Sequence, residues 1–195
     1  MQIFIHRVNQ ASRLSQIDPR YGVEIDLRAD GDRIILNHEP FVGGEDFEDY
    51  LKQFHHAGII LNIKEAGIEQ RVLTLCQQYG VTNYFLLDVE FPYIYRATRA
   101  GVHQIALRYS EDEAIETVLK YRGLADWVWI DTNTRLPLDA TVMQQLAGFH
   151  TCLVCPERWG RPQDIAGYIS QLQALQFPLT AVMTAEAYAD QWSRF

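Results

Sequence analysis

Long hydrophobic runs and abundant cysteines are both missing from this sequence. No stretch of apolar residues approaches the length of a transmembrane helix, and the first residues lack the basic segment and cleavage site of a secretory signal peptide. The cysteines are Cys76, Cys152 and Cys155, and an odd number without a secretion signal is typical of a reducing compartment. These absences predict a cytoplasmic protein without a membrane span.

Cys152 and Cys155 form a C-x-x-C pair, but the context that gives such a pair a function is missing. A redox pair normally opens a helix, whereas this one lies in a strand-like run, and a zinc site would need a second pair. We therefore expect buried structural thiols.

Positive charge is scarce, because 17 Lys and Arg residues stand against 25 Asp and Glu residues and the net charge is −8. Non-specific binding to nucleic acid or to anionic membranes needs basic patches, so the sequence predicts neither. One small phosphorylated ligand can still be bound by a local cluster of Arg, Lys or metal. A glycine-rich phosphate loop after the first predicted strand is also absent, which disfavours an open doubly wound sheet.

What the sequence does have is a regular alternation of short apolar runs and amphipathic segments. Its 195 residues, 48% apolar and 22% charged, suffice for one core, and we treat residues 1–195 as a single compact domain with short loops. Several runs are apolar throughout, as in strands buried on both faces of a parallel sheet. Strands are predicted at residues 2–6, 22–28, 58–64, 83–89, 102–108, 126–132, 151–157 and 178–184.

Helical patterns separate these predicted strands. Helices are predicted at residues 44–56, 66–79, 91–100, 111–122, 139–148, 162–175 and 185–194, with a shorter turn-rich piece at 9–18. A turn signal at residues 30–32 predicts that the second strand continues into an extension at 33–38. Eight alternating strand–helix units are the pattern of an α/β fold of the (β/α)8 TIM barrel class.

Polar side chains gather where the first predicted strands end, which is where a (β/α)8 barrel carries its site. They are His6, Arg7, Glu24, Asp26, His38, Glu39, Asn62 and Lys64. Strand alternation places Glu24 and Asp26 on one face, and two such carboxylates repel each other unless a cation or a proton lies between them. A hard divalent cation with oxygen ligands resolves that repulsion.

The order of these residues resembles the glycerophosphodiester phosphodiesterases, a family of the phosphatidylinositol-phospholipase-C-like superfamily. That family has His-Arg-Gly, Glu-x-Asp, a turn, His-Asp and then Glu-x-Lys, and the matching positions here lie within residues 1–65. The resemblance implies a hydrolase that cleaves a small glycerol- or sugar-phosphodiester. It also implies His6 and His38 as general acid and base, since histidine exchanges protons near neutral pH.

A metal site and phosphate contacts are implied by the same resemblance. Glu24 and Asp26 would hold Mg²⁺ or Ca²⁺, with Asn62 as a third ligand through its carbonyl oxygen. Arg7 and Lys64 would stabilise the charge of the phosphate.

Three positions depart from the family's pattern. Val8 stands in place of Gly, Glu39 in place of Asp, and Asn62 in place of an acidic metal ligand. Because Asn62 brings no charge, the affinity for the metal should be lower than in the family.

Two alternatives to a metal-assisted phosphodiesterase stay open. The three departures suit a weak or inactive relative that binds a phosphorylated ligand. A barrel enzyme of different chemistry, such as an isomerase, would instead use Lys64 with a depressed pKa and no metal.

The ends of the later strands supply candidate substrate contacts on barrel geometry. Arg108 and Trp159 are the predicted substrate-binding residues. Comparable places are taken by Asp88, Glu90, Asp131 and Glu157, whereas the remaining histidines, His55, His56, His103 and His150, are expected to be structural.

Overall fold

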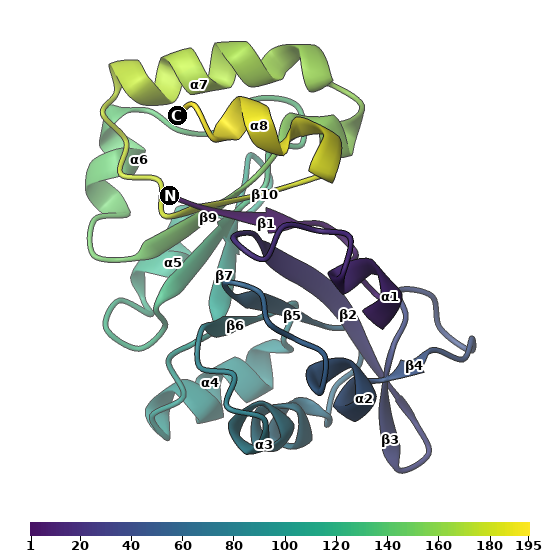
Figure 1. Cartoon of the computed structure of the whole chain (residues 1–195). Helices are drawn as coiled ribbons and strands as arrows, with labels where there is room; N and C mark the ends of the chain where they lie inside the picture. The colour runs from purple at the N-terminus through teal and green to yellow at the C-terminus, as the bar shows by residue number, and fades with distance from the viewer. The chain divides into compact units, whose positions relative to one another are not determined.

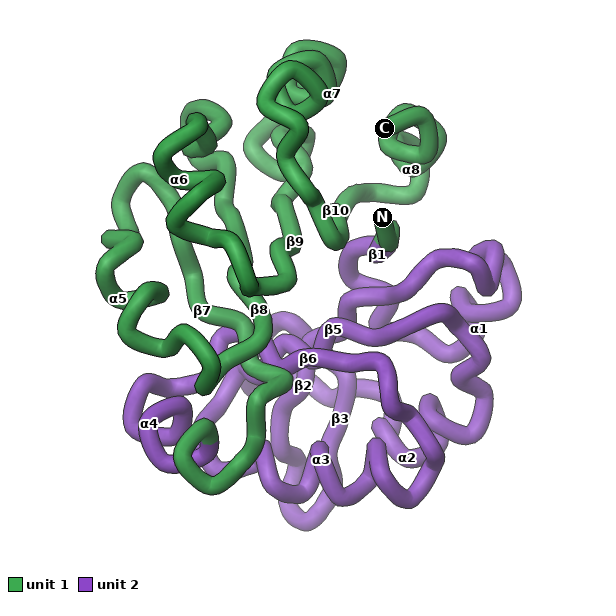
Figure 2. The backbone as a smooth tube through the Cα atoms, turned by 90° about the vertical axis from the view of Figure 1, so that its left-hand side faces the viewer, with its two compact units in different colours: residues 1–3, 98–195 green, residues 4–97 purple.

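The structure, a computed structural model, describes residues 1–195 as strands alternating with helices (Figure 1). The chain divides into two compact units, one of residues 4–97 and one of residues 1–3 and 98–195 (Figure 2). Strand β1 (Gln2–Ile5) contributes to both units. No helix combines the length and the apolar character that crossing a membrane requires.

The unit of residues 4–97 is built on parallel strands in which most residues are buried. β1, β2 (Gly22–Asp30), β5 (Ile59–Ile63) and β6 (Tyr84–Leu87) pair in that order. The register places Phe4 opposite Gly22, where a Cβ would come within 2.4 Å of the Phe4 ring. Glycine at position 22 therefore lets β1 lie close against β2, which sets the place of His6 directly after β1.

Antiparallel strands and helices complete this unit. β2 pairs with β3 (Arg33–Leu36), and β3 pairs with β4 (Glu45–Asp46). Gly31 has a φ of 58° in the turn between β2 and β3, so the predicted turn and the extension after it are confirmed. The helices are α1 (Ala11–Leu14), α2 (Phe47–Leu51), α3 (Glu69–Gln78) and α4 (Phe91–Arg99).

The unit of residues 98–195 repeats the parallel arrangement. Its strands pair in the order β7 (Ala106–Tyr109), β8 (Trp127–Ile130), β9 (His150–Val154) and β10 (Ala181–Thr184). The connecting helices are α5 (Ile115–Leu119), α6 (Ala140–Gln145), α7 (Ile165–Ala174) and α8 (Ala189–Trp192), with 3₁₀ helices η1 (Pro156–Trp159), η2 (Pro162–Asp164) and η3 (Glu186–Tyr188). The N–H of Gln2 donates to the carbonyl oxygen of Thr180 at 2.8 Å, next to β10.

Each of the eight predicted strands overlaps a strand of the structure, and a mixed α/β fold with parallel pairing is confirmed. The apolar runs form strands because both of their faces are buried, as all five residues of β5 show. Closure into a full (β/α)8 barrel and the organisation of residues 1–195 as a single domain stay predictions.

The predicted helix at residues 111–122 is wrong in its first turn, because α5 begins only at Ile115. The carboxylate of Glu111 accepts hydrogen bonds from the N–H groups of Thr134 and Arg135 and from the Thr134 hydroxyl. Burial opposes the ionisation of Glu111, but the hydrogen bonds outweigh it and lower its pKa to about 2. The acidic residue therefore organises a loop instead of beginning a helix.

Candidate functional site

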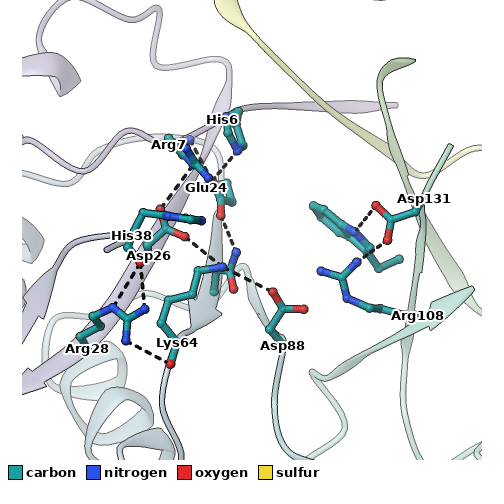
Figure 3. Close-up of polar contacts among 12 residues, drawn as sticks. His6, Arg7, Glu24, Asp26, Arg28, His38, Lys64, Asp88, Arg108 and Asp131 are labelled. Atoms are coloured by element: carbon teal, nitrogen blue, oxygen red, sulfur yellow. Dashed lines mark hydrogen bonds and ion pairs between the residues drawn. The ribbon is translucent and has the colours of Figure 1, made fainter. Parts of the chain in front are cut away.

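The chain turns sharply where β1 ends, and the turn brings His6 and Arg7 onto β2. Arg7 has a φ of 53°, which residues other than glycine rarely adopt, and its N–H donates to Glu24 Oε2 at 2.8 Å. His6 Nε2 lies 3.8 Å from the same carboxylate oxygen (Figure 3). Val8 keeps a negative φ, and its N–H donates to the main-chain oxygen of Glu24 at 2.9 Å. The turn therefore accepts valine where the family has glycine.

Glu24 and Asp26 form a buried pair of carboxylates, each with only 1% of its surface exposed. Alternation along β2 gives both side chains the same side of the strand. Glu24 Oε1 accepts a hydrogen bond from Asn62 Nδ2 at 2.9 Å. Asn9 holds Asp26 at two points, since its Nδ2 donates to Asp26 Oδ2 at 2.8 Å and its Oδ1 accepts the N–H of Asp26 at 2.9 Å.

Negative charge at this pair is only partly compensated. Burial raises the pKa of Glu24 to about 7, and the neighbouring Asp26 charge adds to the rise. Hydrogen bonds from Asn62 and from the N–H of Arg7, together with the charge of Lys64, act in the opposite direction. A buried carboxylate pair with a pKa raised in this way is typical of a functional position.

Lys64 brings positive charge to the pair from the end of β5. Its Nζ lies 3.3 Å from Asp26 Oδ1 and 3.5 Å from Asp88 Oδ2 (Figure 3). Asp88 directly follows β6 and has a φ of 59°. Left-handed backbone at a residue other than glycine is concentrated at functional sites, which supports a role for Asp88 beyond packing. Arg7 adds a second, more distant cation, with its Nε 3.9 Å from Asp26 Oδ2.

His38 lies in the loop after β3 and is held at its main chain by Arg28. Nε and Nη2 of Arg28 donate to the carbonyl oxygen of His38 at 3.2 and 2.9 Å, and Nη1 donates to that of Lys64 at 3.3 Å (Figure 3). The Nδ1 of His38 lies 2.7 Å from Glu39 Oε1, and this hydrogen bond and the charge of His38 lower the pKa of Glu39. With Nδ1 engaged, Nε2 is the ring nitrogen left for proton exchange.

The oxygen atoms around the carboxylate pair suit a hard divalent cation. No group of three or more His, Cys, Asp or Glu side chains is placed to hold a metal ion. An amide oxygen can complete an oxygen-only set, however, and Asn62 Oδ1 is buried without a hydrogen-bond partner. Asp26 Oδ1 is likewise buried and accepts no hydrogen bond, with only the Lys64 ion pair beside it. These two unsatisfied oxygens fit the predicted ligand set of Glu24, Asp26 and Asn62.

Arg108 and Trp159 belong to the other unit, of residues 98–195. Arg108 forms an ion pair with the buried carboxylate of Asp131, to which Trp129 Nε1 also donates, at 3.3 Å (Figure 3). Trp159 is exposed at the end of η1. Their assignment as substrate-binding residues stays a prediction.

Comparisons with known proteins give a likeness in fold. No protein-family model matches the chain, and no curated protein matches its sequence. A solved structure from Agrobacterium tumefaciens, provisionally assigned as a glycerophosphoryl diester phosphodiesterase, superposes with a TM-score of 0.70 at 12% identity. The match covers 100% of this chain and 97% of the other.

Two further solved structures agree with this likeness. A glycerophosphodiester phosphodiesterase from Agrobacterium tumefaciens has a TM-score of 0.61 at 12% identity, over 94% of this chain and 96% of the other. A glycerophosphoryl diester phosphodiesterase from Parabacteroides distasonis has a TM-score of 0.63 at 11% identity, over 97% and 86%. At such identities the likeness shows the fold, so the chain shares the fold of glycerophosphoryl diester phosphodiesterases.

Most of the predicted site residues are brought together within residues 4–97. Direct contacts link His6, Arg7, Glu24, Asp26, Asn62 and Lys64. The main chain of His38 is linked to that of Lys64, because Arg28 donates to the carbonyl oxygens of both residues. The contacts of Asn9 and Arg28 were not predicted from the sequence, and Asp88 was only a secondary candidate. The position of Asp88 just after a strand was the one available signal, since Asn9 and Arg28 act through contacts that no short motif encodes.

Proposed function

We propose that this protein is a phosphodiesterase that hydrolyses a small glycerol- or sugar-phosphodiester. The observation that carries the proposal is the buried pair of Glu24 and Asp26, with His6, Arg7 and Lys64 in contact with it. The shared fold of glycerophosphoryl diester phosphodiesterases supports the same assignment. A packing role would not explain why two carboxylates are buried side by side.

Two histidines would transfer the protons of the reaction. One takes a proton from the attacking hydroxyl or water, and the other gives a proton to the departing alcohol. Each has a carboxylate oxygen close to a ring nitrogen, that of Glu24 for His6 at 3.8 Å and that of Glu39 for His38 at 2.7 Å. His38, with Nδ1 turned to Glu39, would act through Nε2.

Charge on the phosphate would be met by the cations around the pair. Arg7 and Lys64 extend from the ends of β1 and β5 toward Asp26 and would bind phosphoryl oxygens. Mg²⁺ or Ca²⁺, held by Glu24, Asp26 and Asn62, would polarise a phosphoryl oxygen and offset its developing charge.

A second candidate function is binding of a phosphorylated ligand without hydrolysis. The observation that favours it is the ion pair of Lys64 with Asp26, because the site already contains a cation of its own. With this binding function, Lys64 and Arg7 would bind the phosphate, and the histidines would serve as hydrogen-bond donors.

Hydrolysis of a panel of phosphodiesters by the purified protein, with Mg²⁺ or Ca²⁺ present, separates the two functions. We expect His6→Ala and His38→Ala each to lower turnover by roughly 10²–10⁴-fold while the protein stays folded. His55→Ala is the matched control, because His55 is exposed in the same unit and makes none of the site's contacts. A histidine variant with full activity would exclude that residue from the mechanism. No hydrolysis of any diester, together with calorimetric binding of glycerol phosphate, would establish the binding function instead.

A further inference from the structure

Lys64 lies between two carboxylates that differ in their surroundings. Its Nζ is 3.3 Å from Asp26 Oδ1 and 3.5 Å from Asp88 Oδ2 (Figure 3). The Asp26 side chain is 1% exposed, whereas that of Asp88 is 25% exposed. One ammonium group is thus within reach of a buried partner and of a partner that water can also reach.

The oxygen of Asp26 that faces Lys64 is also the oxygen that a divalent cation would need. Asp26 Oδ2 is occupied, since Asn9 Nδ2 donates to it at 2.8 Å and Arg7 Nε lies 3.9 Å away. Asp26 Oδ1 is buried and accepts no hydrogen bond, and the same is true of Asn62 Oδ1. Coordination through Asp26 Oδ1 would bring a divalent charge within a few ångströms of the ammonium group, and two cations at that distance repel strongly.

We propose that Lys64 and the divalent cation compete for Asp26 Oδ1, and that Asp88 is the partner that receives Lys64 when the cation binds. The proposal rests on the cation site of the proposed function. Asp88 is then a positioning residue, which raises the affinity for the cation without touching it. The four-carbon stem of Lys64 lets the ammonium move between two carboxylates that it already approaches from one place.

Competition between Lys64 and the cation also explains how the protein can fold with two buried carboxylates before a cation binds. In the free state Lys64 offsets the charge of Asp26, which would otherwise leave a repelling pair in a dry environment. Removal of Lys64 should therefore weaken the free protein and strengthen the cation complex. An ordinary structural ion pair would produce only the first effect.

A double-mutant cycle measured by calorimetry tests the proposal, with Mg²⁺ and Ca²⁺ as probes of the full chain. We expect Lys64→Met to tighten cation binding by about tenfold or more, and Asp88→Asn to weaken it by several-fold. In the Lys64→Met background, Asp88→Asn should change affinity by less than about twofold, because Asp88 acts through Lys64. Lys52→Met is the control, since Lys52 pairs with Asp49 on the surface and should leave affinity unchanged.

Each outcome counts for or against the proposal. An equal loss of affinity from Asp88→Asn in both backgrounds would mean that Asp88 acts by its charge alone, and its role as the partner that receives Lys64 would be refuted. Unchanged or weaker binding in Lys64→Met would refute it as well, and Lys64→Gln repeats the test if the Met variant does not fold. Cation binding that appears only in Lys64→Met would support it. Because the cycle reads affinity alone, diester hydrolysis by the wild type is judged separately from it.

Discussion

In the proposed cation site, Asn62 stands where the family that the sequence resembles has an acidic metal ligand. Its Nδ2 donates to Glu24 Oε1 at 2.9 Å, and its Oδ1 is left without a hydrogen-bond partner. An aspartate at this position could not donate to Glu24 and would add a third carboxylate to a buried pair. Asparagine thus avoids a third buried carboxylate in the cation-free protein, and in the proposed cation site its Oδ1 would serve as an oxygen ligand.

Replacing Asn62 with Asp should lower the stability of the cation-free protein and raise its affinity for the cation. We expect Asn62→Asp to bind Mg²⁺ or Ca²⁺ about tenfold more tightly, because a formal charge replaces a dipole beside the ion. Its melting temperature in a chelator should fall below that of the wild type and recover when the cation is added. Glu24→Gln should abolish binding. Calorimetry and thermal melts measure both effects, and an unchanged affinity in Asn62→Asp would show that Asn62 is not a ligand.

Glu24 should impose a pH dependence on the stability of the cation-free protein. Burial, with a contribution from Asp26, raises its pKa from 4.5 to about 7, so between these values the folded state binds more protons than the unfolded state. Stability due to this group is therefore fully present below about pH 4.5 and is lost as the pH rises through about 7.

The Glu24→Gln substitution should remove the loss of stability that accompanies rising pH. Relative to the wild type, we expect the variant to gain on the order of 2–3 kcal/mol in the free energy of unfolding between pH 4.5 and pH 8. Urea unfolding in the presence of a chelator at both pH values gives the comparison, and the wild-type reference cancels the contributions of other carboxylates. Parallel pH profiles for the two proteins would contradict the raised pKa.

At the scale of elements, the β2–β3 hairpin and the loop after it determine where His38 lies. The N–H of Asn37 donates to the carbonyl oxygen of Asp26 at 3.1 Å, and Arg28 binds the carbonyl oxygens of His38 and Lys64. One guanidinium thus connects the loop that carries His38 with Lys64, which directly follows β5. Lysine cannot reproduce this contact, because it lacks the planar array of donors.

Loss of this connection should affect turnover more than binding of the substrate. We expect Arg28→Met to lower kcat by roughly 10–100-fold with a smaller change in KM, because misplacement of a reacting group costs rate. Arg28→Lys should not restore it. Arg33→Met on the same hairpin, where Arg33 pairs with Asp30 on the surface, should behave as the wild type. Equal kcat in the Arg28 and Arg33 variants, on a diester that the wild type hydrolyses, would assign Arg28 a structural role only.

For the molecule as a whole, we expect the three cysteines to become reactive only on global unfolding. Cys76, Cys152 and Cys155 are buried thiols, as predicted, and Trp192 Nε1 donates to the sulfur of Cys155 at 3.2 Å. Burial raises the pKa of Cys76 and of Cys155 to about 12. Thiolate, the reactive form, is therefore scarce at Cys76 and Cys155 in the folded protein at ordinary pH.

Thiol reagents should consequently modify the protein only when it unfolds. We expect almost no reaction with an aromatic disulfide reagent at pH 8 under native conditions, and reaction of all three thiols in guanidinium chloride. The native rate should follow the unfolding equilibrium as denaturant is added. Rapid native labelling of a cysteine would mean that its segment opens independently of the rest of the chain.

Much of the fold could be read from the sequence, because the apolar runs that form parallel strands are local features. The eight predicted strands all overlap strands of the structure, and the turn at Gly31 was anticipated. Alternation along a strand likewise placed Glu24 and Asp26 together without knowledge of any partner. The ends of helices were harder to predict from the sequence. The start of α5 is an example, because Glu111 binds Thr134 and Arg135 in another loop.

What only the tertiary structure decided is which side chains complete the site. Asn9 binds Asp26 across 17 positions of the chain, Arg28 reaches Lys64 across 36, and Lys64 meets Asp88 across 24. These contacts depend on the register of β2 against β5 and on the backbone at Arg7 and Asp88, which take a left-handed conformation. Periodicity is a property of neighbouring residues, whereas a partner from another strand is defined only once the strands have paired.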